Sequence, residues 1–190
     1  MIRDARSVIS RFTLHVLRRK TVAVTDTLVL GLGNPLRGDD GVGPVVIGWL
    51  RERGLPSGVT AVDQGIASPE LVLTLESYRR AIVVDAADMG CAPGEWVRFT
   101  PDRVQLKDNT SALSLHTAGL ADVLALGAAL GKLPDEVIIF GVQPAQLEWS
   151  PGLSAGVQAA VPVVGRAVLQ EIGKSYERPL GSQHGENPDH

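Results

Sequence analysis

Residues 27–43 read TLVLGLGNPLRGDDGVG. The first six of them form a short apolar run that ends at a glycine and an asparagine, which is typical of a buried strand that leads into a loop. After the loop, apolar residues recur at helical spacing over residues 42–53, and the pattern stops at Gly54, a residue type that commonly ends helices. This stretch therefore predicts a strand, a glycine-rich loop and a helix in succession.

The rest of the chain repeats the alternation of strand and helix. The predicted elements are a strand at 59–63, a helix at 68–77, strands at 81–85 and 95–100, a helix at 117–130, a strand at 137–141 and a helix at 154–172. Such alternation is typical of an α/β protein with a largely parallel sheet. The segment 95–100 follows strand 81–85 after a loop too short for a helical crossover, so we expect it to run antiparallel.

The bulk composition suits one compact domain. The chain has 190 residues, of which 44% are hydrophobic, and a formal net charge of −3. We expect an N-terminal extension at 1–25, helical or disordered, a single folded domain at 26–173, and a disordered tail at 174–190. The mild negative charge offers no basic surface for nucleic acid or an anionic membrane. No apolar run reaches the roughly 18 to 20 residues that span a bilayer.

The cysteine count gives a prediction about the cellular compartment. Cys91 is the one cysteine of the sequence, so an internal disulfide is excluded and a thiolate metal cluster cannot form within the chain. The lack of a disulfide is compatible with a reducing cytoplasm, where we expect the protein to act. We also expect a monomer that binds neither nucleic acid nor a membrane. Cys91 is better interpreted as an ordinary loop thiol than as a nucleophile.

Acidic residues follow three of the predicted strands. Asp39 and Asp40 come after the first strand, Asp63 ends the second and Asp85 ends the third. In α/β sheets ligands bind beyond the carboxyl ends of the strands, where loops from several strands converge. His116 is the one histidine within the predicted core of the fold. Carboxylates and an imidazole suit a borderline divalent ion such as zinc, nickel or cadmium, although spacing alone does not show that these side chains meet.

Simpler structural roles are open for several of these residues. Asp39 can cap the helix that begins near Gly41, Asp63 can bind loop amides, and Asn34 can close a turn. If the backbone there is extended, Asp39 and Asp40 face opposite ways, so only one of the two needs to point into the crevice.

Other catalytic and binding motifs fit poorly. The Gly-x-Gly opening at Gly31 lacks the third glycine of a dinucleotide-binding loop, since Leu36 stands in its place, and two acidic residues would repel a pyrophosphate. The sequence contains no P-loop.

A set of motifs spread over residues 27–171 resembles the hydrogenase maturation protease family. The motifs are, in order, GNPLRGDDGVG, VDQG with Asp63, VVDAAD with Asp85, the Pro-Gly pair at 93–94, and HTAGLADVL from His116. The sequence departs from the commonest family pattern after Asp63, where Gln64 and Gly65 replace a glycine pair.

The resemblance implies a three-layer α/β/α sandwich with a twisted, mostly parallel mixed sheet of about five strands. It implies an endopeptidase that removes the C-terminal extension of a [NiFe]-hydrogenase large-subunit precursor after nickel insertion. The family's metal-binding trio corresponds to Asp40, Asp85 and His116, which are thus the expected ligands and catalytic residues. Asn34, Asp39 and Asp63 are expected substrate contacts.

By the same resemblance, the nickel belongs to the precursor and no permanent metal is expected, although zinc or cadmium can substitute in the site. Two alternatives remain open at this stage. The first is a non-catalytic nickel-binding chaperone of hydrogenase assembly that uses the same trio. The second is a metallo-aminopeptidase or another hydrolase of related fold, which would hold a resident metal.

Overall fold

The structure is a computed structural model that describes residues 25–103, 114–115 and 118–174. Residues 1–24 of the expected extension (1–25) and residues 175–190 of the expected tail (174–190) lie outside the described residues, while Thr25 already belongs to the first strand. The elements are, in chain order, β1 (Thr25–Leu32), η1 (Gly38–Gly41), α2 (Val42–Arg53), β2 (Val59–Gly65), α3 (Leu71–Leu75), β3 (Tyr78–Asp88), β4 (Trp96–Phe99), η2 (Pro101–Arg103), β5 (Ser114–Leu115), α4 (Ala118–Ala129), β6 (Glu136–Val142) and α5 (Ala155–Ile172).

These strands form one mixed sheet in the order β2-β1-β3-β6-β4. The first four run parallel to one another, whereas β4 is antiparallel to β6. The short strand β5 pairs antiparallel with the end of β3. The predicted α/β class and the antiparallel direction of segment 95–100 are both confirmed. That segment pairs with β6 rather than with β3, the strand that precedes it in the sequence.

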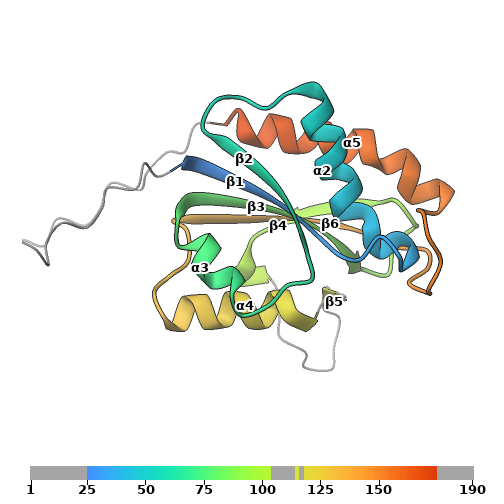
Figure 1. Cartoon of the computed structure of the whole chain (residues 1–190). Coiled ribbons are helices and arrows are strands. Elements are labelled where there is room, and N and C mark those ends of the chain that lie inside the picture. Colours follow the sequence, from blue (N-terminus) through green and yellow to red (C-terminus); the bar gives the residue numbers. More distant parts are fainter. Residues whose placement is uncertain (1–24, 104–113, 116–117, 175–190) are drawn as a thin grey trace, which may run out of the picture.

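Helices cover both faces of the sheet (Figure 1), with α2 and α5 on one side and α3 and α4 on the other. Successive strand residues point to opposite faces, and the core is divided accordingly. Val29 and Ile82 belong to the cluster that includes α2 and α5, while Leu30 and Val83 belong to the cluster that includes α3 and α4. Because both faces are covered, the strands are apolar on both sides. This is the predicted three-layer sandwich.

The helix predicted at 68–77 is shorter in the structure. Its helical part is α3, five residues long, and a hydrogen bond from Leu71 N to Ser68 O (2.9 Å) forms a turn in front of it. Residues 76–77 form a turn rather than a last helical turn, and the strand that follows begins directly after it at Tyr78, earlier than the sequence suggested. The predicted cap Thr117 of α4 lies outside the described residues.

A cluster of charged side chains lies at the amino end of β3 and β6, away from the ends where ligands bind in this class of sheet. Arg80 Nε lies 2.6 Å from Glu136, and Arg80 Nη2 lies 2.8 Å from Glu171 of α5. Arg98 of β4 also pairs with Glu171, at 2.9 Å. Burial works to raise the pKa of Glu171, but hydrogen bonds from Arg98 and Lys174 outweigh it and lower the pKa to about 2. The cluster ties α5 to three strands.

Candidate functional site

The loops that follow β1, β2, β3 and β6 meet at the carboxyl end of the sheet. In the sheet register Gly31 lies beside Asp63 on one side and Val84 on the other, and Asp85 lies beside Gly141 of β6. The turn η1, which carries Asp39 and Asp40, packs against β3. The predicted acidic residues of three different strand ends are therefore brought to one end of the molecule.

Direct backbone contact holds α2 against the strand ends. A Cβ atom on Gly43 would lie 2.2 Å from Leu32 O and 2.6 Å from Val84 O, so no larger residue fits without displacing the backbone. The first turn of α2 therefore rests directly on the ends of β1 and β3. Because η1 immediately precedes α2, this contact fixes Asp40 close to the strand that carries Asp85.

Asp40 is almost fully buried, at 6% exposure. Its Oδ2 atom accepts a hydrogen bond from Asn34 N at 2.8 Å, which orients the carboxylate. The loop closes tightly on itself, since Gly33 has a φ of 114° and a Cβ there would lie 1.8 Å from Asp40 O. Asn34 also accepts a hydrogen bond from Leu36 N through its Oδ1 atom, at 3.0 Å. Asn34 thus closes the turn, as its simpler interpretation predicted.

Asp39 is fully buried and binds a distant segment of the chain. Its carboxylate accepts hydrogen bonds from Ala145 N (2.8 Å), Gln146 N (3.2 Å), Ser154 N (2.6 Å) and Ser154 Oγ (2.9 Å). It does not cap α2, which has no side-chain cap. Asp39 and Asp40 bind different neighbours because they lie in a 3₁₀ turn, where successive side chains point about a third of a turn apart. The two side chains do point in different directions, as expected, but the backbone there is a 3₁₀ turn and not an extended segment.

Asp85 is 0% exposed and lies in the carboxyl-terminal half of β3. Beyond it, Ala87 pairs with Leu115 and Asp88 pairs with Ser114 of β5. His116, the third predicted ligand, lies outside the described residues. Ser114 and Leu115, which precede it in the sequence, pair with β3 just beyond Asp85 and so lie at the same end of that strand.

The start of α4 also lies at this end of the sheet. A Cβ on Gly119 would lie 2.5 Å from Ala67 O, in the loop that follows β2. Asp63 is exposed in that region, and its Oδ1 atom accepts a hydrogen bond from Gly65 N at 3.2 Å. The simpler interpretation of Asp63, as a residue that binds a loop amide, is confirmed.

Gln143 is a structural residue of this region that sequence reasoning missed. Its Oε1 atom accepts hydrogen bonds from Met89 N (2.7 Å) and Cys91 N (3.4 Å), and its Nε2 atom donates to Asp88 Oδ1 (3.2 Å). One side chain thus holds the loop that follows β3. Its position as the first polar residue after predicted strand 137–141 was the available signal.

Cys91 has the properties of a loop thiol. Burial raises the pKa of this thiol, and a hydrogen bond and the negative charge of Glu95 raise it further. A raised pKa keeps the sulfur protonated at neutral pH, which is unfavourable for a nucleophile.

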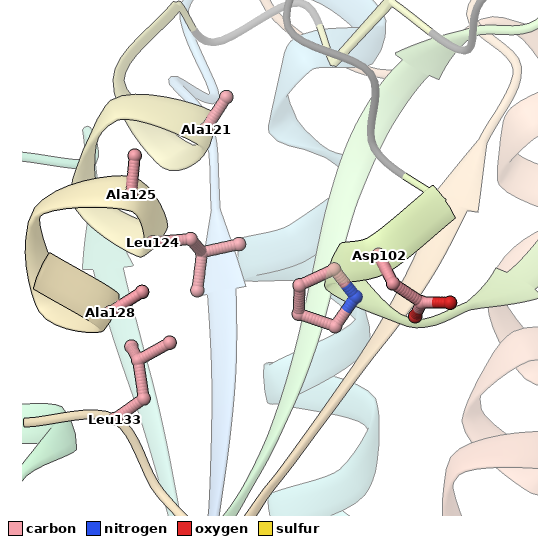
Figure 2. A pocket seen from close by; sticks show the side chains of 7 residues that line it. Asp102, Ala121, Leu124, Ala125, Ala128 and Leu133 are labelled. Carbon is pink, nitrogen blue, oxygen red and sulfur yellow. The ribbon is translucent and has the colours of Figure 1, made fainter. Parts of the chain in front are cut away.

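Among residues 25–103, 114–115 and 118–174, no three His, Cys, Asp or Glu side chains gather as a metal site. The predicted trio requires His116, which is not among them. A cavity of about 290 Å³ does occur between α4 and η2 (Figure 2), lined by apolar residues such as Leu124 and Leu133 with Asp102 at its edge. It contains none of the predicted site residues. The described helices include none with the length and hydropathy that a bilayer-crossing segment requires.

Comparison with known proteins supplies the family. Residues 44–171 match the family model described as hydrogenase maturation protease. A hydrogenase expression/formation protein of Azotobacter chroococcum, HupM, is 41% identical over 122 residues, which are 64% of this chain and 58% of that protein. The chain thus spans less than two thirds of the length of that relative. A hydrogenase expression/formation protein of Bradyrhizobium diazoefficiens, HupD, is 35% identical over 156 residues, with 80% of this chain and 81% of that protein covered.

A solved structure agrees with these sequence relatives. The hydrogenase maturating endopeptidase HybD from Escherichia coli superposes with a TM-score of 0.67 at 32% identity, covering 78% of this chain and 94% of that chain. The two proteins share the α/β fold. On its sequence and its fold, the chain belongs to the hydrogenase maturation protease family.

Proposed function

We propose that the protein is an endopeptidase that removes the C-terminal extension of a [NiFe]-hydrogenase large-subunit precursor after nickel insertion, and that it recognises the bound nickel. The observation that carries this proposal is the pair of buried carboxylates, Asp40 and Asp85, brought to one end of the sheet from separate strand ends. The family membership supports the same activity.

The residues of the site suit a nickel ion that arrives with the substrate. Asp40 and Asp85 supply carboxylate oxygens, and His116 supplies an imidazole nitrogen, donors that borderline divalent ions accept. Burying carboxylates is costly, and a divalent cation offsets that cost. Asp40 is held in a fixed orientation by Asn34 N, so little reorganisation is needed when the precursor docks. Zinc or cadmium would fit the same donors.

Cleavage follows once the precursor is held in this way. Nickel that arrives with the precursor would be held by Asp40, Asp85 and His116, and there it would supply polarisation of a peptide carbonyl and activation of water. Asp40 or Asp85 is then positioned to accept a proton from that water as general base. The chain's own contribution is to orient the scissile bond and to keep two acceptor groups beside it. Asp63, exposed at the rim, contacts the precursor in this proposal, whereas Asn34 and Asp39 act by shaping the loop.

The test is mass spectrometry of the purified precursor, nickel-loaded and nickel-free, after incubation with the protein. We expect release of a C-terminal peptide from the loaded precursor only, and a loss of at least about a hundredfold in rate for Asp40→Asn. The matched control is Asp102→Asn, the same change at an exposed aspartate beside the distant cavity, which should cleave normally.

Two results would overturn the proposal. Equal cleavage of nickel-free precursor would remove nickel recognition from the activity. Tight binding of loaded precursor by the unmodified protein without any peptide release would identify it as a non-catalytic assembly chaperone instead.

A further inference from the structure

The loop that follows β6 is fastened to the loop that carries Asp40. Gly38 N donates to Ser150 O at 2.7 Å, and Asp39 N donates to Gln146 O at 3.1 Å. The Asp39 carboxylate adds its bonds to the amides of residues 145, 146 and 154. The segment 145–154 and the turn η1 therefore form one rigid unit.

This unit exposes two large apolar side chains. Trp149 is 76% exposed and Leu36 is 59% exposed. An isolated parallel bridge pairs Arg37 with Ser150, so the residues one position earlier, Leu36 and Trp149, are neighbours across the bridge. The Arg37 guanidinium carbon lies 5.9 Å from the centroid of the Trp149 ring, and Arg37 Nη2 donates to Leu147 O at 3.3 Å. Arg37 thus contacts both the exposed ring and the backbone of the segment that carries it.

Exposed tryptophan with a neighbouring arginine is characteristic of binding surfaces. Water-exposed apolar area is unfavourable, and Trp and Arg are the residue types most enriched among those that dominate protein association. Two side chains bury far less than the roughly 1,000 Å² that a stable dimer requires. The surface therefore suits a local contact within a larger, transient complex better than self-association.

We infer that Leu36, Arg37 and Trp149 form a docking surface for an apolar segment of the large-subunit precursor, next to the nickel-recognising carboxylates. This inference rests on the proposed function for the identity of the partner. The hydrogen bonds of Asp39 connect the segment that carries Trp149 to the turn that carries Asp40. A precursor bound at Trp149 is therefore held at a fixed position relative to Asp40. Docking at Trp149 then places the precursor's metal over the site.

A docking contact of this kind acts on binding rather than on the chemical step. An interaction made equally in the bound and the transition state lowers KM and leaves kcat unchanged. Removing the indole therefore raises KM, whereas damage to the catalytic carboxylates lowers kcat. The two effects separate docking from catalysis.

The experiment measures steady-state cleavage of nickel-loaded precursor by the full-length protein and its variants. For Trp149→Ala we expect KM to rise about tenfold or more at unchanged kcat, a typical effect of losing an aromatic contact. Leu36→Ala should raise KM about threefold. The matched control is Leu73→Ala, on α3 at 61% exposure, which should leave both constants unchanged. Thermal melts that match the unmodified protein show that each variant is folded.

The outcomes distinguish this inference from the proposed function. Cleavage by Trp149→Ala with an unchanged KM overturns the docking surface and leaves the protease function standing. If the unmodified protein does not cleave, its binding to the loaded precursor is measured by calorimetry. A loss of affinity in Trp149→Ala supports the docking surface. Equal affinity of the two proteins, or no binding by the unmodified protein, overturns it.

Discussion

The carboxylate of Asp39 accepts hydrogen bonds from both the backbone amide and the hydroxyl of Ser154, at 2.6 and 2.9 Å. Ser154 is the N-cap residue of α5, yet its own side chain makes no cap bond. The aspartate from the first loop instead satisfies the amide of the N-cap residue itself, from 115 residues away in sequence. The start of the last helix and the turn that carries Asp40 are thereby held by one side chain.

Replacement of Asp39 by alanine should destabilise the fold. The amides of residues 145, 146 and 154 lose their acceptor, so the free energy of unfolding falls by about 3 kcal/mol, measured by urea denaturation. Ser154→Ala removes only the hydroxyl bond and should cost about 1 kcal/mol. Equal losses for the two variants would contradict the role of Asp39 as a clamp.

Two glycines of α2 should respond in opposite directions to alanine. Gly43→Ala places a methyl group against Leu32 O and Val84 O and should lower the free energy of unfolding by about 3 kcal/mol. Gly48→Ala, on the exposed side of the same helix, meets nothing within 4 Å and should raise it by about 1 kcal/mol. Denaturant titrations of the two variants compare them directly. A neutral Gly43→Ala would contradict the close backbone contact.

The Glu171 cluster should make stability depend on acidic pH. Its folded pKa is about 2 against an ordinary value of 4.5. A lowered folded pKa stabilises the protein fully above the unfolded value, and the contribution disappears as the pH falls from about 4.5 towards 2. Glu171→Gln should flatten this part of the pH profile and cost about 3 kcal/mol at pH 7.

The control for Glu171 is Glu76→Gln. Glu76 pairs with Lys132 at 2.9 Å on the surface, and breaking such an exposed pair should cost less than about 1 kcal/mol. Unfolding curves at pH 7, 4 and 3 report both variants. If the stability of Glu171→Gln falls between pH 7 and pH 3 as steeply as that of the unmodified protein, other carboxylates govern acid unfolding.

Cys91→Ser should cleave the precursor at the rate of the unmodified protein. The thiol pKa is raised by burial and by Glu95, and a protonated thiol is a poor nucleophile. Iodoacetamide should likewise react slowly with Cys91 at pH 7. A variant that fails to cleave while still folded would contradict the interpretation of Cys91 as an ordinary loop thiol.

The purified protein should carry no stoichiometric metal. Elemental analysis of protein purified without chelator should find well below one nickel or zinc per chain, and chelator treatment should leave the melting temperature unchanged. Added zinc should bind to the unmodified protein and bind more weakly to Asp85→Asn. A tightly held resident ion would favour the metallo-hydrolase alternative.

The sequence predicted the order and type of the main elements because their signals are local. Strand 27–32 and helix 42–53 are marked by apolar periodicity and by Gly54. The structure has the helix at these residues and the strand at Thr25–Leu32. The partner of β4 was not predictable in this way, since the choice of β6 over β3 depends on packing between distant segments.

The site was predicted as residue types rather than as contacts. Asp40 and Asp85 were identified through the family resemblance, and the structure brings their elements together. The role of Asp39 could not be read from the sequence, because its donors lie more than a hundred residues further along the chain. A capping role was considered for it, but at α2, since sequence reasoning finds only near neighbours. The placement of His116 remains a prediction.

The edge strand β4 limits how the molecule can associate with copies of itself. It has four residues, and its Arg98 side chain is held by Glu171 of α5. A strand so short, with a charged side chain on it, offers a poor template for the strand of another molecule. The sheet therefore stops growing at this edge, and crowded molecules in a cell have little opportunity to join their sheets there into an aggregate.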